Sequence, residues 1–300
     1  MILNCGWLCP DEVGFLLAVL NGRAGRVPLH SRDCAGSKTC AGALWNQLGI
    51  ALQGNGDSEE ALRAYQHAVE LDGHNSDARS NLGIALVNGG RAEEGIAEFR
   101  KILEADPANN VARVNIGFAH LQKGELPEAE VDFRDVIRRD PTSAIAHYDL
   151  GVTLKQEDSL EAAQVELRRA LALDKTLSDA HYRLGVIAWQ TGEFEDAARE
   201  MQAANDLNPV YGEAYVMLGT ILKQQAKLSA AERALRTAIT FDADNPGAYN
   251  SLGQVLRAEG QLDESRLAFA KGARAEQHKR HELGSMLSQK ATMTTVIAVQ

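Results

Sequence analysis

A 34-residue spacing organises most of this chain and limits what it can fold into. A leucine or isoleucine followed by glycine returns in register, and a period of this length is typical of repeat proteins. The pairs are Leu48-Gly49, Leu82-Gly83, Ile116-Gly117, Leu150-Gly151, Leu184-Gly185, Leu218-Gly219 and Leu252-Gly253. Because repeat units stack along one direction, the spacing predicts one array of seven units and not two separate globular domains.

The hydrophobic pattern inside one unit predicts two helices. Leu82 and Leu86 lie four residues apart and therefore share one face of a helix. A second apolar stripe with helical spacing lies between residues 96 and 103. Gly89 and Gly90 interrupt the pattern between the stripes, because glycine adopts without steric cost the left-handed conformation that ends a helix. We therefore expect each unit to be a hairpin of two helices.

The glycine of each repeated pair is expected to mark a close contact between helices. In an exposed helix it would destabilise the chain by about 1 kcal/mol, so its return in every unit needs a structural reason. A neighbouring helix that crosses at close range supplies that reason. A hairpin this short cannot bury its apolar face alone, so we expect stacking on the next hairpin to complete the core.

These residues resemble a known repeat family. The matching frame is Trp45-x2-Leu48-Gly49-x2-Leu52, followed by Ala61-x3-Tyr65-x2-Ala68. It is similar to the tetratricopeptide repeat, whose pattern is W-x2-L-G-x2-Y, then A-x3-F and a late proline. The resemblance implies an all-α fold, a right-handed superhelix of about seven helical hairpins with a C-terminal capping helix. Asp158 and Ala226 depart from the pattern, since they stand where other units carry the turn glycine.

We expect three parts along the chain. Residues 1–41 precede the repeats, residues 42–279 form them without insertion, and residues 280–300 form a capping helix and a tail. The expected repeats are 42–75, 76–109, 110–143, 144–177, 178–211, 212–245 and 246–279.

Residues 1–41 hold all four cysteines and lack the repeat pattern. A secretory signal needs positive charge before its apolar core, but Asp11 and Glu12 precede the apolar run 13–20, which argues against one. Three interpretations stay open: a disordered tail or a start codon placed too early, a degenerate repeat, and a metal site. The candidate metal ligands are Cys5, Cys9, His30, Cys34 and Cys40.

Charge and hydropathy exclude two classes of partner. The net charge is -10 and no block of lysine and arginine is present, whereas a nucleic-acid surface needs clustered cations. The longest apolar runs, 13–20 and 291–299, are far shorter than the roughly 20 residues that span a bilayer. We therefore expect no nucleic acid, no membrane insertion and a cytoplasmic location.

The sequence contains no constellation typical of catalysis. No phosphate-binding glycine loop, zinc-protease motif or hydrolase elbow is present. His147 and His181 lie 34 residues apart, but they stand where other repeats carry a tryptophan or tyrosine, so we expect both rings to pack between helices. The chain is therefore predicted to be no enzyme and to hold no cofactor and no metal.

The candidate site is a stripe on the first helix of each hairpin. In the proteins that this chain resembles, that stripe lines a concave groove that holds an extended peptide. Here amides recur at one edge of the stripe, large apolar groups fill its middle, and charges are few. If the stripe faces inward, we expect Tyr148, Tyr182 and Trp189 to form one aromatic patch. The alternative is that some members, Val152 and Val186 above all, only pack against the next helix. The candidate residues are Asn81, Asn115, Phe118, Gln122, Tyr148, Val152, Lys155, Gln156, Tyr182, Arg183, Val186, Trp189, Gln190, Lys223 and Gln224.

The stripe argues against two specialised subfamilies. Clamps that hold the acidic C-terminus of a chaperone carry lysine and asparagine where this chain carries Tyr148 and Val152. Asn81 and Asn115 resemble the asparagine ladder of O-linked N-acetylglucosamine transferase, but the ladder stops at Asp149.

Three functional hypotheses follow from this pattern. The first is a non-enzymatic scaffold or adaptor that binds an extended segment of another protein in the groove. The second is a substrate-recruiting arm or subunit of a larger enzyme, such as a glycosyltransferase-type assembly. The third is self-association through an uncapped end of the array.

Overall fold

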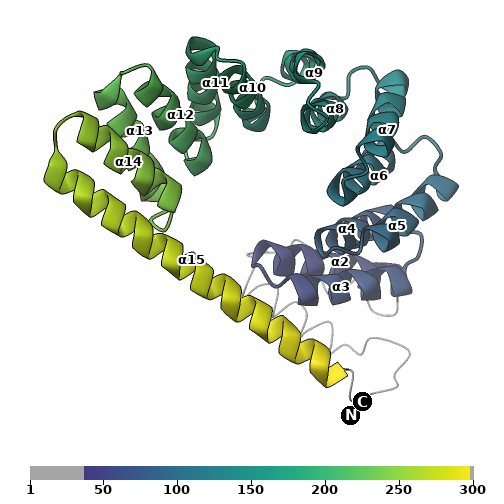
Figure 1. Ribbon diagram of the computed structural model, residues 1–300. Helices are drawn as coiled ribbons and strands as arrows, with labels where there is room; N and C mark the ends of the chain where they lie inside the picture. The colour runs from purple at the N-terminus through teal and green to yellow at the C-terminus, as the bar shows by residue number, and fades with distance from the viewer. Residues whose placement is uncertain (1–36, 298–300) are drawn as a thin grey trace. The chain divides into compact units, whose positions relative to one another are not determined.

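All regular structure in the described part of the chain is helical. The computed structural model describes residues 37–297 and, within them, side chains up to residue 281. This part holds 14 α-helices and no strand, which confirms the all-α prediction (Figure 1). The chain divides into two compact units, the first ending at Glu157 and the second beginning at Asp158.

The first unit contains the first three hairpins and one further helix. We call the first helix of a hairpin the A helix and the second the B helix, so even-numbered helices are A helices and odd-numbered ones are B helices. The helices of this unit are α2 (Lys38–Gly54), α3 (Ser58–Leu71), α4 (Ser76–Asn88), α5 (Ala92–Ala105), α6 (Asn110–Lys123), α7 (Leu126–Arg139) and α8 (Ala144–Gln156).

The second unit begins with a B helix and ends with an unusually long one. Its helices are α9 (Leu160–Leu173), α10 (Ser178–Gln190), α11 (Phe194–Leu207), α12 (Gly212–Gln224), α13 (Leu228–Phe241), α14 (Pro246–Ala258) and α15 (Leu262–Ile297).

Within each unit the A helices lie closer together than the B helices. Neighbouring A helices contact each other, for example α2 with α4 and α12 with α14, and an A helix such as α4 or α12 also contacts the B helices before and after it. Among the described helices of either unit, consecutive B helices such as α3 and α5 make no such contact. A stack whose A helices approach each other while its B helices spread must curve toward the A-helix side.

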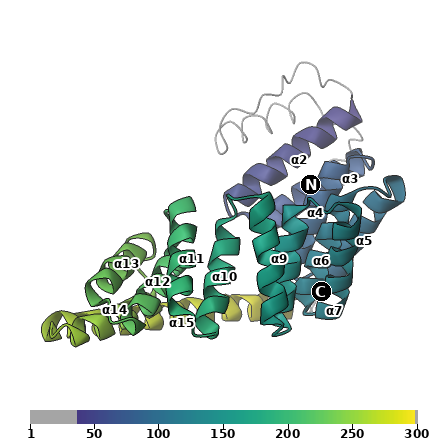
Figure 2. The same cartoon turned by 90° about the horizontal axis from the view of Figure 1, so that it is seen from above.

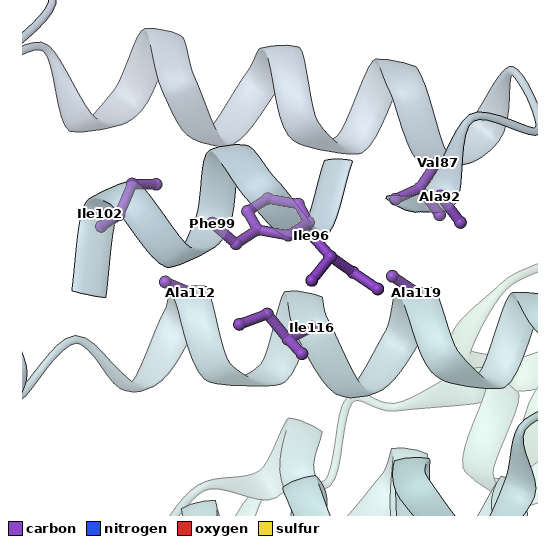
Figure 3. Packing of buried hydrophobic residues seen from close by; sticks show 8 residues of the cluster. All are labelled: Val87, Ala92, Ile96, Phe99, Ile102, Ala112, Ile116 and Ala119. Atoms are coloured by element: carbon purple, nitrogen blue, oxygen red, sulfur yellow. The ribbon is translucent and has the colours of Figure 1, made fainter. Parts of the chain in front are cut away.

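The core is built from side chains of successive hairpins, as the stripes predict. Phe99 and Ile96 of α5 are fully buried, and they meet Val87 of α4 and Ile116 of α6 in one cluster (Figure 3). Leu82 of α4 belongs instead to the cluster of the preceding hairpin. Each hairpin therefore buries its apolar area on both neighbours, which makes the repeats mutually dependent.

The repeated glycine lies where the large residue of the B helix crosses the A helix. A methyl group placed on Gly83 would be 2.5 Å from Cε1 of Phe99, and one on Gly117 would be 2.8 Å from Cε1 of Phe133. Real carbon atoms do not approach this closely. The prediction that these glycines mark a close helix crossing is therefore confirmed.

Two hairpin turns keep the left-handed conformation without a glycine. The turn glycines of other hairpins, such as Gly90 and Gly124, have φ values of 79° and 76°. Asp158 and Ala226 replace that glycine and still have φ values of 62° and 56°. The backbone path between the helices of a hairpin is thus retained against the preference of these residues.

Replacing Ala226 by glycine is expected to stabilise the protein by about 1 kcal/mol. A non-glycine residue costs about 1–2 kcal/mol in the left-handed region, and glycine removes this strain but adds entropy to the unfolded chain. Urea denaturation measures the change. Gly90→Ala is the matched control and should lower the free energy of unfolding, because it places a side chain at a φ of 79°. Equal effects of the two variants would contradict the explanation.

The segment at 280–300, expected to form a capping helix and a tail, continues the last B helix as far as Ile297. Helix α15 runs without a break from Leu262 to Ile297 and joins the last B helix to that segment (Figures 1 and 2). The other B helices end at an aspartate or asparagine, such as Asp72 or Asp174, whereas the last repeat carries the good helix former Glu276 at this place. One continuous helix cannot fold back over its own first half. A capping role of residues 280–300 stays a prediction.

Most of the N-terminal segment lies outside the described residues. The interpretations of residues 1–41 therefore concern a part of the chain of which only residues 37–41 are described. Of the candidate metal ligands, Cys40 alone falls in this range, and it is disulfide-bonded, so its sulfur is not a free thiolate.

Candidate functional site

The predicted stripe lies on the A helices and is exposed to different degrees. Its large apolar members are all half-buried, so each packs partly on the core and leaves part of its surface exposed. Its glutamines are all exposed. The half-buried residues are Phe118, Tyr148, Val152, Tyr182, Val186 and Trp189, and the exposed ones are Gln122, Gln156, Gln190 and Gln224.

In the second unit, Tyr182 and Trp189 of α10 pack against the core that α10, α11 and α12 share. The ring of Tyr182 lies 5.1 Å from that of Tyr211, and the hydroxyl of Tyr211 donates a hydrogen bond of 2.7 Å to Asp179. Burial raises the pKa of both tyrosines, and the nearby Glu213 adds to the effect on Tyr182. Tyr211 was missed by the sequence analysis, although it stands where most repeats carry an asparagine or serine.

Trp189 is fixed in place by a hydrogen bond to the next A helix. Its indole Nε1 donates to Oε1 of Gln224 on α12 at 2.9 Å. Lys223 of α12 similarly donates to Gln254 of α14. Two predicted peptide contacts, Gln224 and Lys223, therefore already have partners within the protein. The amide of Gln224 keeps its two N–H donors, because only its oxygen is used by Trp189.

The asparagines of the first unit join neighbouring A helices. The side-chain amide of Asn81 on α4 donates to Oδ1 of Asn46 on α2 at 2.9 Å, and that of Asn115 on α6 donates to Oγ of Ser80 on α4 at 3.2 Å. Asn46 is buried. These hydrogen bonds join one hairpin to the next. Asn81 and Asn115 as peptide contacts stay a prediction.

The three rings of the predicted aromatic patch come from both units of the chain. Tyr148 belongs to the first unit, and Tyr182 and Trp189 belong to the second. The guanidinium of Arg183 lies 5.7 Å from the centre of the Tyr182 ring, which places a cation beside this aromatic group. A patch that includes Tyr148 stays a prediction, as do Val152, Lys155 and Gln156 as peptide contacts.

A buried carboxylate on α8 was not predicted as a functional or strained residue. The side chain of Asp149 is buried, with 8% of its surface exposed, and this burial raises its pKa to about 7. Asn81 and Asn115 occupy the same place in the two preceding repeats. This comparison of repeats could have revealed Asp149 from the sequence, because Asp149 places an ionisable group where the two preceding repeats carry a neutral amide.

The two histidines in register have separate structural partners. His147 is buried with Nε2 at 3.3 Å from the carbonyl oxygen of Pro141, and Nδ1 of His181 lies 2.7 Å from a carboxylate oxygen of Glu200. Among the described residues, no group of three or more acidic, histidine or cysteine side chains could hold a metal ion. No helix in the same part of the chain is long and apolar enough to cross a membrane.

Comparison with known proteins identifies the repeat. The family model described as tetratricopeptide repeat matches residues 46–110, 115–177, 154–211 and 216–278, which together make up well over half of the chain. The chain belongs to the tetratricopeptide repeat family. Tetratricopeptide repeats generally mediate contacts between proteins and are typically not enzymes. No curated protein matches this chain in sequence.

Solved structures of tetratricopeptide repeat proteins support the fold. A crystal structure of MamA has a TM-score of 0.52 and 28% sequence identity, and the match covers 55% of this chain and 97% of that one. A crystal structure of the APC/C hetero-tetramer Cut9–Hcn1 has a TM-score of 0.64 and 13% identity, covering 82% of this chain and 46% of that one. The structure of Pseudomonas aeruginosa pilF has a TM-score of 0.58 and 16% identity, and the match covers 74% of this chain and 99% of that one.

Proposed function

We propose that this chain is a non-enzymatic scaffold whose A helices bind an extended segment of a partner protein. The observation that carries the proposal is the geometry around Trp189. Its ring is half-buried and held by Gln224, and the exposed Gln190 follows it on the same helix. A fixed aromatic surface with amides beside it suits a peptide, because little side-chain entropy is lost on binding.

The exposed glutamines extend this surface along the array. Gln122, Gln156, Gln190 and Gln224 stand at the same place in four successive repeats. An amide can both donate to and accept from a peptide backbone, which permits binding with modest sequence selectivity. The curvature of each unit toward its A-helix side supports a groove there. The half-buried Lys155 and Lys223 would then affect mainly the association rate and its salt dependence.

A photo-crosslinking amino acid placed at Gln190 tests where the partner binds. We expect it to capture a partner in cells, because the Gln190 side chain is exposed on the A-helix face. The matched control places the same amino acid at Val165 of α9, a B-helix residue that is 63% exposed. Capture of the same partner from both places would argue against the A-helix face.

Trp189→Ala is expected to lower the affinity for that partner at least about tenfold, which corresponds to about 1.4 kcal/mol. The helical content should be retained, because the tryptophan ring is only half-buried. Isothermal titration measures the affinity and circular dichroism the fold, with Val165→Ala as the control. A Trp189→Ala protein that stays folded and binds as before would refute the proposed site.

A further inference from the structure

Two A helices of the second unit lack the cap that most A helices have. Before the others stands a serine or asparagine whose side chain accepts a hydrogen bond from the backbone of the first turn. These residues are Ser37, Asn75, Asn109, Ser143 and Asn245. Helices α10 and α12 are preceded by Leu177 and Tyr211, which make no such bond. Losing a cap costs about 1 kcal/mol, so an apolar side chain is retained at both places at the expense of helix stability.

Around the second of these places lies an exposed apolar surface, which we call the edge patch. It consists of Leu207, Val210, Tyr211, Tyr215 and Phe241. Leu207, Val210 and Phe241 are 42%, 65% and 46% exposed. The rings of Tyr215 and Phe241 are stacked with their centres 6.0 Å apart. A methyl group on Gly212, at the start of α12, would lie 3.8 Å from Cβ of Phe241, so the turn before α12 lies near the end of α13. Exposed apolar groups of this kind mark interaction sites.

The same places in other repeats show how far the fold requires the edge patch. Where Val210 stands, the third and fourth repeats carry Thr142 and Thr176. Where Phe241 stands, the second repeat carries Ala105. The other repeats carry no valine where Val210 stands, whereas Leu71, Leu173 and Leu207 stand where Phe241 does. Val210 is therefore the member of the edge patch that the hairpins need least.

Carboxylates stand close in sequence to the residues of the edge patch. Asp206, Glu213 and Asp242 are each next or next but one in sequence to one of its members, and Asp179 accepts the hydrogen bond of Tyr211. The cation of Lys279 lies 3.6 Å from Asp242, but both side chains are nearly half exposed, so this pair is worth little. A partner that binds the edge patch is therefore expected to carry a cation beside an apolar side chain.

We propose that the edge patch is a second docking surface, which binds a polypeptide segment with an aliphatic or aromatic side chain next to lysine or arginine. The apolar side chain would cover Val210 and Phe241, and the cation would be attracted by Asp206 and Asp242. The surface lies at the turns between hairpins and uses none of the glutamines of the A-helix face. Tyr211 is the member of the edge patch that lies beside that face, because its ring packs against Tyr182.

The test uses two synthetic peptides and a variant that keeps the charge of the protein. Both peptides carry a central Leu-Phe pair, flanked by lysines in one and by glutamates in the other. The variant combines Val210→Thr with Phe241→Ala, residues that other repeats carry at the same places. We expect the lysine peptide to bind the full chain, and to bind at least about tenfold more weakly to the variant. The glutamate peptide should also bind at least about tenfold more weakly.

Controls separate the edge patch from general attraction to an acidic protein. Val165→Thr removes an equally exposed valine from α9 and should leave binding of the lysine peptide unchanged. Trp189→Ala should also leave it unchanged, which distinguishes a failure here from a failure of the A-helix site. Tyr211→Asn, which introduces the residue found at Asn109, should also weaken binding. Its folding is checked separately, because the change adds a helix cap but removes a ring that packs beside Tyr182.

Three outcomes would overturn the proposal. They are no binding of the lysine peptide, equal binding of the two peptides, and equal binding of the lysine peptide to the wild-type chain and to the folded double variant. Fluorescence polarisation at two salt concentrations measures all of these affinities, and circular dichroism confirms that each variant is folded.

Discussion

Gly83→Ala is expected to lower the free energy of unfolding by about 2 kcal/mol. The added methyl group would lie 2.5 Å from Cε1 of Phe99, whose side chain is fully buried. Either the ring leaves its place or α4 and α5 move apart, and overpacking of this kind typically costs about 1–3 kcal/mol, occasionally more. The better intrinsic helix propensity of alanine, worth about 1 kcal/mol, is too small to offset it. Urea denaturation gives the free energies.

Gly54→Ala is the matched control for this experiment. Gly54 also lies in an A helix, at the end of α2, but no atom lies within 4 Å of the place where its methyl group would stand. We expect its free energy of unfolding to stay within about 1 kcal/mol of the wild type. If Gly83→Ala behaves like this control, the close crossing of α4 and α5 does not determine the choice of glycine.

Asp149→Asn is expected to raise the free energy of unfolding by about 2 kcal/mol at pH 8. Burial raises the pKa of this carboxyl group to about 7 from its usual value of 3.8. The folded state therefore holds the proton more tightly than the unfolded chain does. The contribution of this group to stability is fully present below about pH 4 and is lost as the pH rises to about 7. Asparagine avoids that loss because it carries no charge.

The pH profile distinguishes this explanation from a simple change of packing. Wild type and Asp149→Asn should unfold at similar denaturant concentrations near pH 4 and diverge as the pH approaches 8. The fold tolerates the substitution, since Asn81 and Asn115 stand at this place in other repeats. A difference in stability that is the same at both pH values would mean that ionisation of Asp149 is not its cause.

The repeat period determined the helices of this protein without any knowledge of its tertiary structure. Leu82 and Leu86 on one helix, and Phe99 on the next, became buried as their spacing predicted. Gly83 predicted a close helix crossing, because glycine lowers the stability of a helix and yet stands at this place in every repeat. The helices and their buried faces depend on residues that are near each other in the chain. Because the same pattern occurs seven times, it can be distinguished from a chance arrangement.

Properties that depend on contacts between repeats were decided only by the tertiary structure. Sequence placed Trp189 and Gln224 on one stripe, but their hydrogen bond joins residues on different helices and shows that this glutamine is not wholly free. The pairing of Tyr211 with Tyr182 also arises where one hairpin meets another, and the spacing of the repeats did not predict the burial of Asp149. Spacing predicts which face of a helix a side chain occupies, whereas burial, hydrogen-bond partners and pKa depend on what the neighbouring hairpin places against that face.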